Sequence, residues 1–149
     1  MKSVQKNEIS LETANLLIDK AIEEAAKGNF SIVATVVNKD GVLIALKKMD
    51  NAVTGPVDVS IKKARTAALF GFDSKAFGEI AQPGQPIYSI ENTNGGLISF
   101  GGGVTLKQND EVIGALGVAG ASVDDDERIA KVAVHHFVEH LTTSEIVTK

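Results

Sequence analysis

The sequence predicts an α+β three-layer sandwich, in which a five-stranded antiparallel sheet lies between two layers of helices. Helical and extended patterns follow one another in the order helix, hairpin, helix, short helix, three strands, helix. The connections between successive strands are too short for a crossover, so those strands pair antiparallel. The first two extended segments are apolar on both alternating faces, which predicts that helices cover both faces of the sheet.

The N-terminal half begins with a predicted helix over residues 10–27, where Ser10 stands at the cap position and Gly28 follows the last apolar residue. Two β-branched segments come next, at 31–37 and 42–49. The Asn-Lys-Asp-Gly sequence between them is typical of a hairpin turn.

The rest of the chain supplies three helices and three strands. Pro56 suits the first turn of a helix, which we expect to end at Gly71. The remaining segments are a short helix from 73 or 74 to about 80, strands at 97–100, 104–107 and 111–119, and a last helix from 124 to about 141. We expect residues 1–149 to form a single domain, with flexible ends at 1–9 and 142–149.

Composition excludes several classes of protein. The chain has no cysteine, which excludes disulfides, thiolate catalysis and Cys-ligated metal sites. The net charge is −4 and basic residues are scattered, so we expect no nucleic-acid partner. Apolar runs are too short to span a bilayer, and the polar first residues do not resemble a signal peptide. We therefore expect a cytoplasmic protein that does not enter membranes.

Glycine clusters mark two candidate positions for a ligand. Gly101, Gly102 and Gly103 form either a sharp bulged corner or a loop that faces a ligand or another chain. A second set of glycines recurs along the last strand, which indicates either close packing of a helix or room for a flat ligand. This set comprises Gly114, Gly117 and Gly120.

Charged and imidazole side chains give further candidates. Arg65 lies in the second helix, either on a solvated face with its neighbouring lysines or half-buried and able to hold an anion. His136 and His140 are four residues apart in the last helix, where we place them on the core-facing stripe. The pair is either structural or a metal or haem ligand; we expect it to be structural and to hold no metal, because zinc sites use three or four ligands.

The acidic run from Asp124 to Glu127 begins the last helix and could suggest a cation site. Acidic residues in a first helical turn are expected from capping and the helix dipole, and the spacing lacks a calcium-loop pattern. No serine, histidine and acid are grouped for nucleophilic catalysis. The apolar residues of the second helix cover more than one face, which predicts a homo-oligomer.

Three segments together resemble a known family. The first runs from Ala34 to Asp50, and the second is the Lys-Ala-Arg-Thr-Ala motif at 63–67. The third combines Gly-Gly-Gly-Val at 101–104 with Gly-Ala-Leu-Gly-Val-Ala-Gly-Ala-Ser at 114–122 and Asp126-Glu127. They are similar to the GlcG/HbpS-like haem-binding family, which includes the C-terminal domain of PduO. The resemblance covers about residues 10–134. It implies a profilin-like fold, self-assembly, and a link to glycolate, diol or glycerol use.

The resemblance also implies a function and a site. We expect a small ligand-binding accessory protein, with haem or another tetrapyrrole as ligand. Arg65 would pair with a ligand carboxylate, and the wall of the site would comprise Met49, Phe100, Gly101, Gly102 and Gly103. No histidine lies in the matched segments to ligate iron. Two alternatives stay open: an enzyme that degrades haem or acts on a small hydroxy acid or diol, and a purely structural assembly module.

Overall fold

The computed structural model describes the backbone of residues 1–148 and side chains as far as Glu139. Its elements in chain order are α1 (Leu11–Lys27), β1 (Val33–Asn38), β2 (Leu43–Lys48), α2 (Gly55–Phe70), α3 (Ser74–Ile80), the 3₁₀ helix η1 (Ile90–Asn92), β3 (Gly103–Gln108), β4 (Glu111–Ala119) and α4 (Val123–Thr148).

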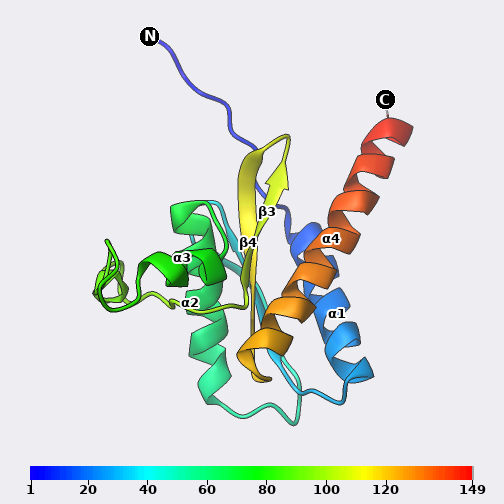
Figure 1. Ribbon diagram of the computed structural model, residues 1–149. Helices are drawn as coiled ribbons and strands as arrows, with labels where there is room; N and C mark the ends of the chain where they lie inside the picture. Colours follow the sequence, from blue (N-terminus) through cyan, green and yellow to red (C-terminus); the bar gives the residue numbers. More distant parts are fainter. Residues whose placement is uncertain (149) are drawn as a thin grey trace.

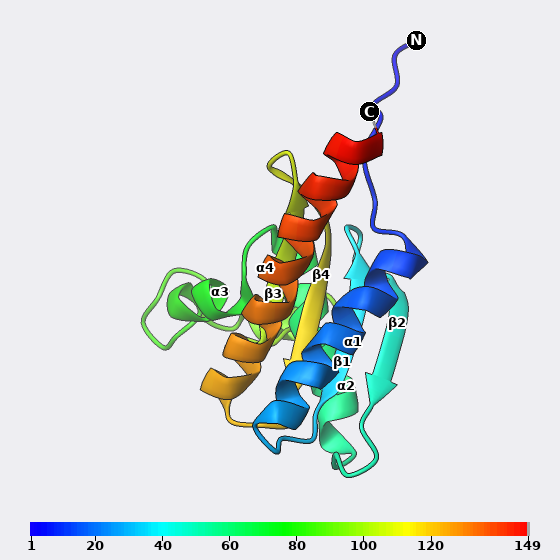
Figure 2. The same cartoon turned by 90° about the vertical axis from the view of Figure 1, so that its right-hand side faces the viewer.

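The elements form an α+β fold in which helices cover both faces of one sheet (Figure 1). Helices α2 and α3 lie on one face, and α1 and α4 lie on the other. The latter two helices run side by side across the sheet (Figure 2). The α+β class is thus confirmed, whereas a specifically profilin-like arrangement stays a prediction.

The sheet has four strands within the described residues, in the order β2-β1-β4-β3 with every neighbour antiparallel. The predicted fifth strand at 97–100 is wrong. The amide of Leu97 donates to the carbonyl of Glu91 at 3.0 Å, and the amide of Ile98 donates to Thr66 Oγ1 of α2 at 3.0 Å. These donors are therefore used by η1 and α2, and the segment packs on helices instead of joining the sheet.

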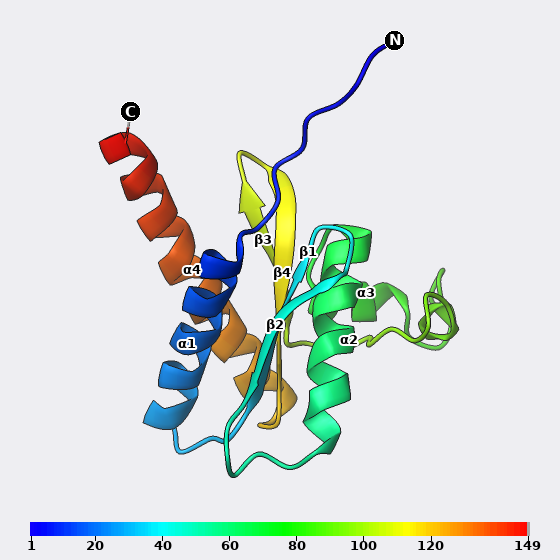
Figure 3. The same ribbon diagram turned by 180° about the vertical axis from the view of Figure 1, so that it is seen from behind.

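The two strands of the first hairpin differ in burial. Every residue of β1 is buried, as predicted, because β1 is an inner strand with helices on both sides. Strand β2 is one of the two edge strands of the sheet (Figure 3), and its residues are half-buried or exposed. The prediction that β2 is covered on both faces is therefore wrong, because α1 contacts this strand whereas α2 packs mainly on β4, β1 and β3.

Glycines in β4 allow close packing, as one of the two interpretations predicted. A Cβ atom at Gly117 would overlap the backbone carbonyl of Ser60 in α2. A Cβ at Gly114 would lie 2.7 Å from the carbonyl oxygen of Val37. The space beside this strand is therefore filled by α2 and by β1, not left open for a flat ligand.

Both chain ends continue the fold further than expected. Ser10 caps α1 by accepting a hydrogen bond from the amide of Thr13 at 3.1 Å. Just before it, the amide of buried Ile9 donates to the carbonyl of Ile113 at 3.0 Å. Helix α4 runs past the predicted end to Thr148. Flexibility of 1–9 and 142–149 stays a prediction. Across the described residues, no helix is long and apolar enough to cross a membrane.

Candidate functional site

The three-glycine corner is held by the first residue of α3. Ser74 Oγ donates to the carbonyl of Phe100 at 2.7 Å and accepts from the amide of Gly103 at 2.8 Å. Gly102 has a φ of +123°, which L side chains rarely adopt, and a Cβ there would lie 2.7 Å from Lys63 Nζ. The corner needs glycine because it packs directly on Lys63 of α2.

Lys63 is a fully buried amine at the centre of this region. Its side chain is 1% exposed. Nζ donates to the carbonyl of Val118 at 2.9 Å and lies 3.1 Å from Asp126 Oδ2. The ring centroid of Phe100 lies 5.2 Å from Nζ, within cation–π range. Lys63 therefore joins α2, the end of β4 and the start of α4.

The acidic run at the start of α4 divides into two parts. Ser122 and Asp125 form the cap: Ser122 Oγ accepts from the amide of Asp125 at 3.1 Å and donates to its carboxylate at 2.7 Å. Asp126 turns inward to Lys63, and its other oxygen accepts from the amide of Ala121 at 2.9 Å. The capping interpretation is thus confirmed for Asp125, while Asp126 also forms a buried ion pair.

Glu127 is the second buried acid, and it also contacts the glycine corner. Its Oε1 accepts from the amide of Gly102 at 3.1 Å. Its Oε2 lies 3.5 Å from Nζ of Lys131, a contact too long for a strong hydrogen bond. The cluster therefore contains one buried cation, Lys63, and two buried carboxylates.

Burial shifts both partners of the ion pair toward their neutral forms. Desolvation lowers the pKa of Lys63 below 10.5, although Asp126 and Glu127 oppose the shift. Desolvation raises the pKa of Asp126 above 3.8, although Lys63 and backbone amides oppose it. Both shifts have the same physical cause, which is the loss of water around a charged group in the buried cluster.

A hollow of ≈ 380 Å³ opens beside this pair. Its walls are mostly apolar and come from the start of α2, the end of β4 and the start of α4. The lining residues are Gly55, Pro56, Val59, Lys63, Phe100, Ala119, Gly120, Ala121, Val123 and Asp126. We call it the Lys63 hollow.

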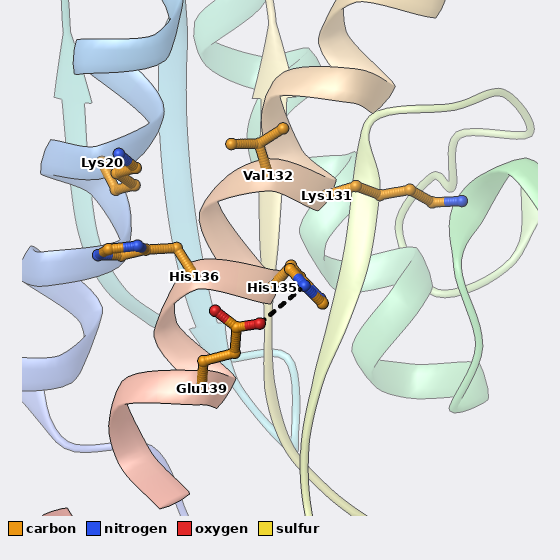
Figure 4. Close-up of a pocket in the computed structure, with 6 residues that line it drawn as sticks. All are labelled: Lys20, Lys131, Val132, His135, His136 and Glu139. Atoms are coloured by element: carbon orange, nitrogen blue, oxygen red, sulfur yellow. Dashed lines mark ion pairs between the residues drawn. The ribbon is translucent and has the colours of Figure 1, made fainter. Parts of the chain in front are cut away.

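A second hollow of ≈ 470 Å³ lies between α1 and α4; most of its lining residues carry charged or imidazole groups, but the surface they line it with is mainly apolar (Figure 4). Its lining residues are Lys20, Lys131, Val132, His135, His136 and Glu139. His136 points from α4 toward α1, whereas His135 Nε2 lies 3.2 Å from Glu139 Oε1. We call it the α1–α4 groove.

The placement of the histidines on the core-facing stripe is wrong for His136, which is exposed. The buried stripe of α4 runs through Ala130, Ala133 and Phe137. At about 100° per residue, His136 lies roughly a quarter turn from the centre of that stripe. The side chain of His140 falls outside the described residues. Among the side chains that are described, no three histidines or acids group to hold a metal ion.

The structure separates the residues predicted to form one site. Phe100 lines the Lys63 hollow, and Gly101–Gly103 are buried beside it. Arg65 is two residues from Lys63, about 200° around α2, and its Nη1 donates to the carbonyl of Asn94 at 2.9 Å. Met49 packs against the core, where its Sδ accepts from the amide of Ile32 at 3.3 Å. Arg65 and Met49 line neither hollow.

Sequence reasoning missed Lys63 and Asp126 as partners. A usable signal exists for Lys63, because it is in helical register with Ser60, Ala64 and Ala67, which pack on the sheet. A lysine among small residues on an inward face needs an acidic partner. No such signal identifies Asp126, since all four acids of the run suit a helix start equally well.

Comparisons with known proteins agree on one family. A family model described as haem degrading protein HbpS-like matches residues 9–135. GlcG of Escherichia coli strain K12 is 34% identical over 111 residues, which cover 74% of this chain and 81% of GlcG. The crystal structure of the Klebsiella pneumoniae protein ORFY is 32% identical with a TM-score of 0.89, covering 93% of this chain and 96% of that one. The crystal structure of a PduOC–haem complex is 29% identical with a TM-score of 0.82, covering 86% and 94%.

Proposed function

The chain belongs to the HbpS-like family, and on this premise we propose that it is a haem-binding accessory protein. The single observation that carries the proposal is the likeness to PduOC, whose structure was solved as a complex with haem. A role in glycolate, diol or glycerol use and a cytoplasmic location are the finer parts of the same proposal.

A haem site offers apolar contact, cations for the propionates, and a ligand for iron, most often His, Cys, Met or Tyr. The Lys63 hollow has the apolar walls, but its lining offers no imidazole or thioether, and its one amine already contacts Val118 and Asp126. The α1–α4 groove combines imidazoles at His135 and His136 with the cations Lys20 and Lys131. The groove is therefore the better fit for this group.

We place the roles within the groove accordingly. Lys20 and Lys131 would pair with the propionates, and an imidazole of His135 or His136 would ligate the iron. Glu139 lies 3.2 Å from His135 Nε2, a contact that would fix the ring orientation, as carboxylates do behind metal-ligating histidines. Bound haem would supply a redox-active iron; this chain's own residues hold and orient it.

The test is a haemin titration followed by absorbance in the Soret region. We expect a shifted Soret band with the wild type and its loss in the double variant His135→Gln plus His136→Gln. Arg65→Ala is the matched control, because it removes a cation outside the groove. If Arg65→Ala loses haemin binding and the double histidine variant keeps it, the site lies at Arg65 and the glycine corner instead. Absence of any haemin binding would overturn the proposed function.

Oxidative haem breakdown is a second candidate, favoured by the description of the matching family as haem-degrading. A reductant and oxygen added to the haemin complex would then bleach the Soret band and yield an open-chain tetrapyrrole. A band that stays constant for hours under these conditions would leave binding alone.

We also propose that the protein is a homo-oligomer. Val57, Val59 and Ile61 of α2 stay half-buried in the single chain, and Leu43 at the edge strand β2 is 49% exposed. A second copy would cover this apolar surface. Light scattering at micromolar concentration should report at least twice the chain mass of 15.6 kDa. A monomer would contradict the proposal.

A further inference from the structure

We propose that Lys63 captures a small neutral carbonyl compound as an imine in the Lys63 hollow, with Asp126 as the proton carrier. This inference goes beyond haem binding and does not depend on it, because it concerns a different hollow. Three observations carry it: a buried amine that lines a hollow, a carboxylate in contact with that amine, and apolar walls around both.

The amine is positioned for attack. Nζ is held by the carbonyl of Val118 at 2.9 Å and by Asp126 Oδ2 at 3.1 Å, and the Phe100 ring stands 5.2 Å away. The lysine ammonium has three N–H donors. Two of them are directed at these two acceptors, which also fixes the direction of the third. Desolvation also lowers the pKa of Lys63, which increases the neutral amine that nucleophilic chemistry requires.

The reaction balances without an oxidant or a further reactant. The Lys63 ammonium passes one proton to Asp126, and the neutral nitrogen then bonds to the carbonyl carbon. The nitrogen, which now carries two protons and a positive charge, passes one of them to the carbonyl oxygen, and the product is a neutral carbinolamine. The proton held by Asp126 then goes to the hydroxyl, which leaves as water when the C–O bond breaks. The product is a protonated imine that carries the one positive charge the lysine had.

The hollow indicates the size and charge of the carbonyl compound. At ≈ 380 Å³ it is at the low end of the usual range of about 300–1,000 Å³ for small-molecule sites. Its side-chain walls include Pro56, Val59, Phe100 and Val123. Buried charge near it comprises Lys63 against Asp126 and Glu127, so an anionic keto acid would meet an excess of carboxylates. A short neutral aldehyde or ketone fits best.

The test traps the imine in the full-length wild type with sodium cyanoborohydride and butyraldehyde at pH 7, followed by peptide mapping with mass spectrometry. We expect Lys63 to gain one butyl group on the order of tenfold faster than exposed lysines, because Nζ lines a hollow that can hold the aldehyde and burial favours its neutral form. Pyruvate in place of butyraldehyde should label Lys63 much more slowly.

Two variants complete the experiment. Lys63→Arg should abolish the fast labelling. Lys62→Arg is the matched control: Lys62 is the neighbouring residue, pairs with Asp58 at 3.0 Å and does not line the hollow, so this variant should keep the fast labelling. The wild-type map decides the question even if Lys63→Arg does not fold. Uniform labelling of all lysines, or an unlabelled Lys63, would overturn the proposal, and preference for pyruvate would overturn the ligand class.

Discussion

The two hollows of this protein differ in where their charges lie. In the Lys63 hollow the ion pair of Lys63 and Asp126 is almost fully buried, at 1% and 3% exposure. In the α1–α4 groove the pair of His135 and Glu139 is 79% and 68% exposed. Both pairs have similar separations, 3.1 and 3.2 Å.

The comparison shows that burial, and not separation, distinguishes the environments of these two ionisable pairs. The groove pair is exposed, so water screens the interaction between its side chains. The buried pair is desolvated, so its partners depend on each other for stability and shift toward their neutral forms. The following predictions test this difference, from the largest expected effect to the smallest.

Removal of one buried partner should have the largest effect. Asp126→Ala leaves the Lys63 charge without a partner, and we expect the free energy of unfolding to fall by about 3–5 kcal/mol. Asp19→Ala is the control, since Asp19 pairs with Lys47 at 2.6 Å but both side chains are about half exposed. We expect a loss within about 1 kcal/mol for this variant. Urea unfolding of both variants measures the two losses of unfolding free energy. Equal losses would contradict the prediction.

Substitution of the glycine corner should be the next largest effect. Gly102→Ala places a Cβ 2.7 Å from Lys63 Nζ and 2.6 Å from the carbonyl oxygen of Val118, at a φ of +123°. We expect a loss of about 1–3 kcal/mol from overpacking, with backbone strain in addition. Gly84→Ala has a φ of +84° but no atom within 4 Å, so it isolates the strain alone. Thermal unfolding of the two variants should rank Gly102→Ala as clearly less stable.

The pH dependence of stability should report Asp126. Its folded-state pKa is raised, so its contribution is fully present below the unfolded value and is lost as the pH rises through the folded value. Relative to Asp126→Asn, the wild-type free energy of unfolding should therefore fall as the pH rises above 3.8, by at most about 1.4 kcal/mol per pH unit. Urea unfolding across a pH series measures this difference, and a rising curve would show the opposite shift.

The pair of His135 and Glu139 in the α1–α4 groove should contribute least to the free energy of unfolding. Glu139→Gln removes a solvent-exposed partner of His135, and we expect the free energy of unfolding to change by less than about 1 kcal/mol. The same urea series measures it. A loss as large as that of Asp126→Ala would mean that exposure does not separate the two pairs.

Local patterns in the sequence determined most of the elements. The hairpin turn before β2, the cap at Ser10 and the strand at 111–119 were all predicted, because each depends on residues adjacent in the chain. Pairing of successive strands followed from their short connections. The family was also identified from three short segments, and its model matches residues 9–135.

Tertiary structure alone decided the rest, because it depends on which groups meet across the fold. Residues 97–100 have strand-like composition. The amides of Leu97 and Ile98 nevertheless donate to Glu91 and Thr66, and not to a neighbouring strand. Lys63 and Arg65 are near neighbours in the sequence, but a helix turns them to different surroundings, and only the packing of α2 on the sheet shows that Lys63 is the buried one. Among the acids of this run, Asp126 is the one that contacts Lys63, at 3.1 Å, a partner 63 positions away in the chain.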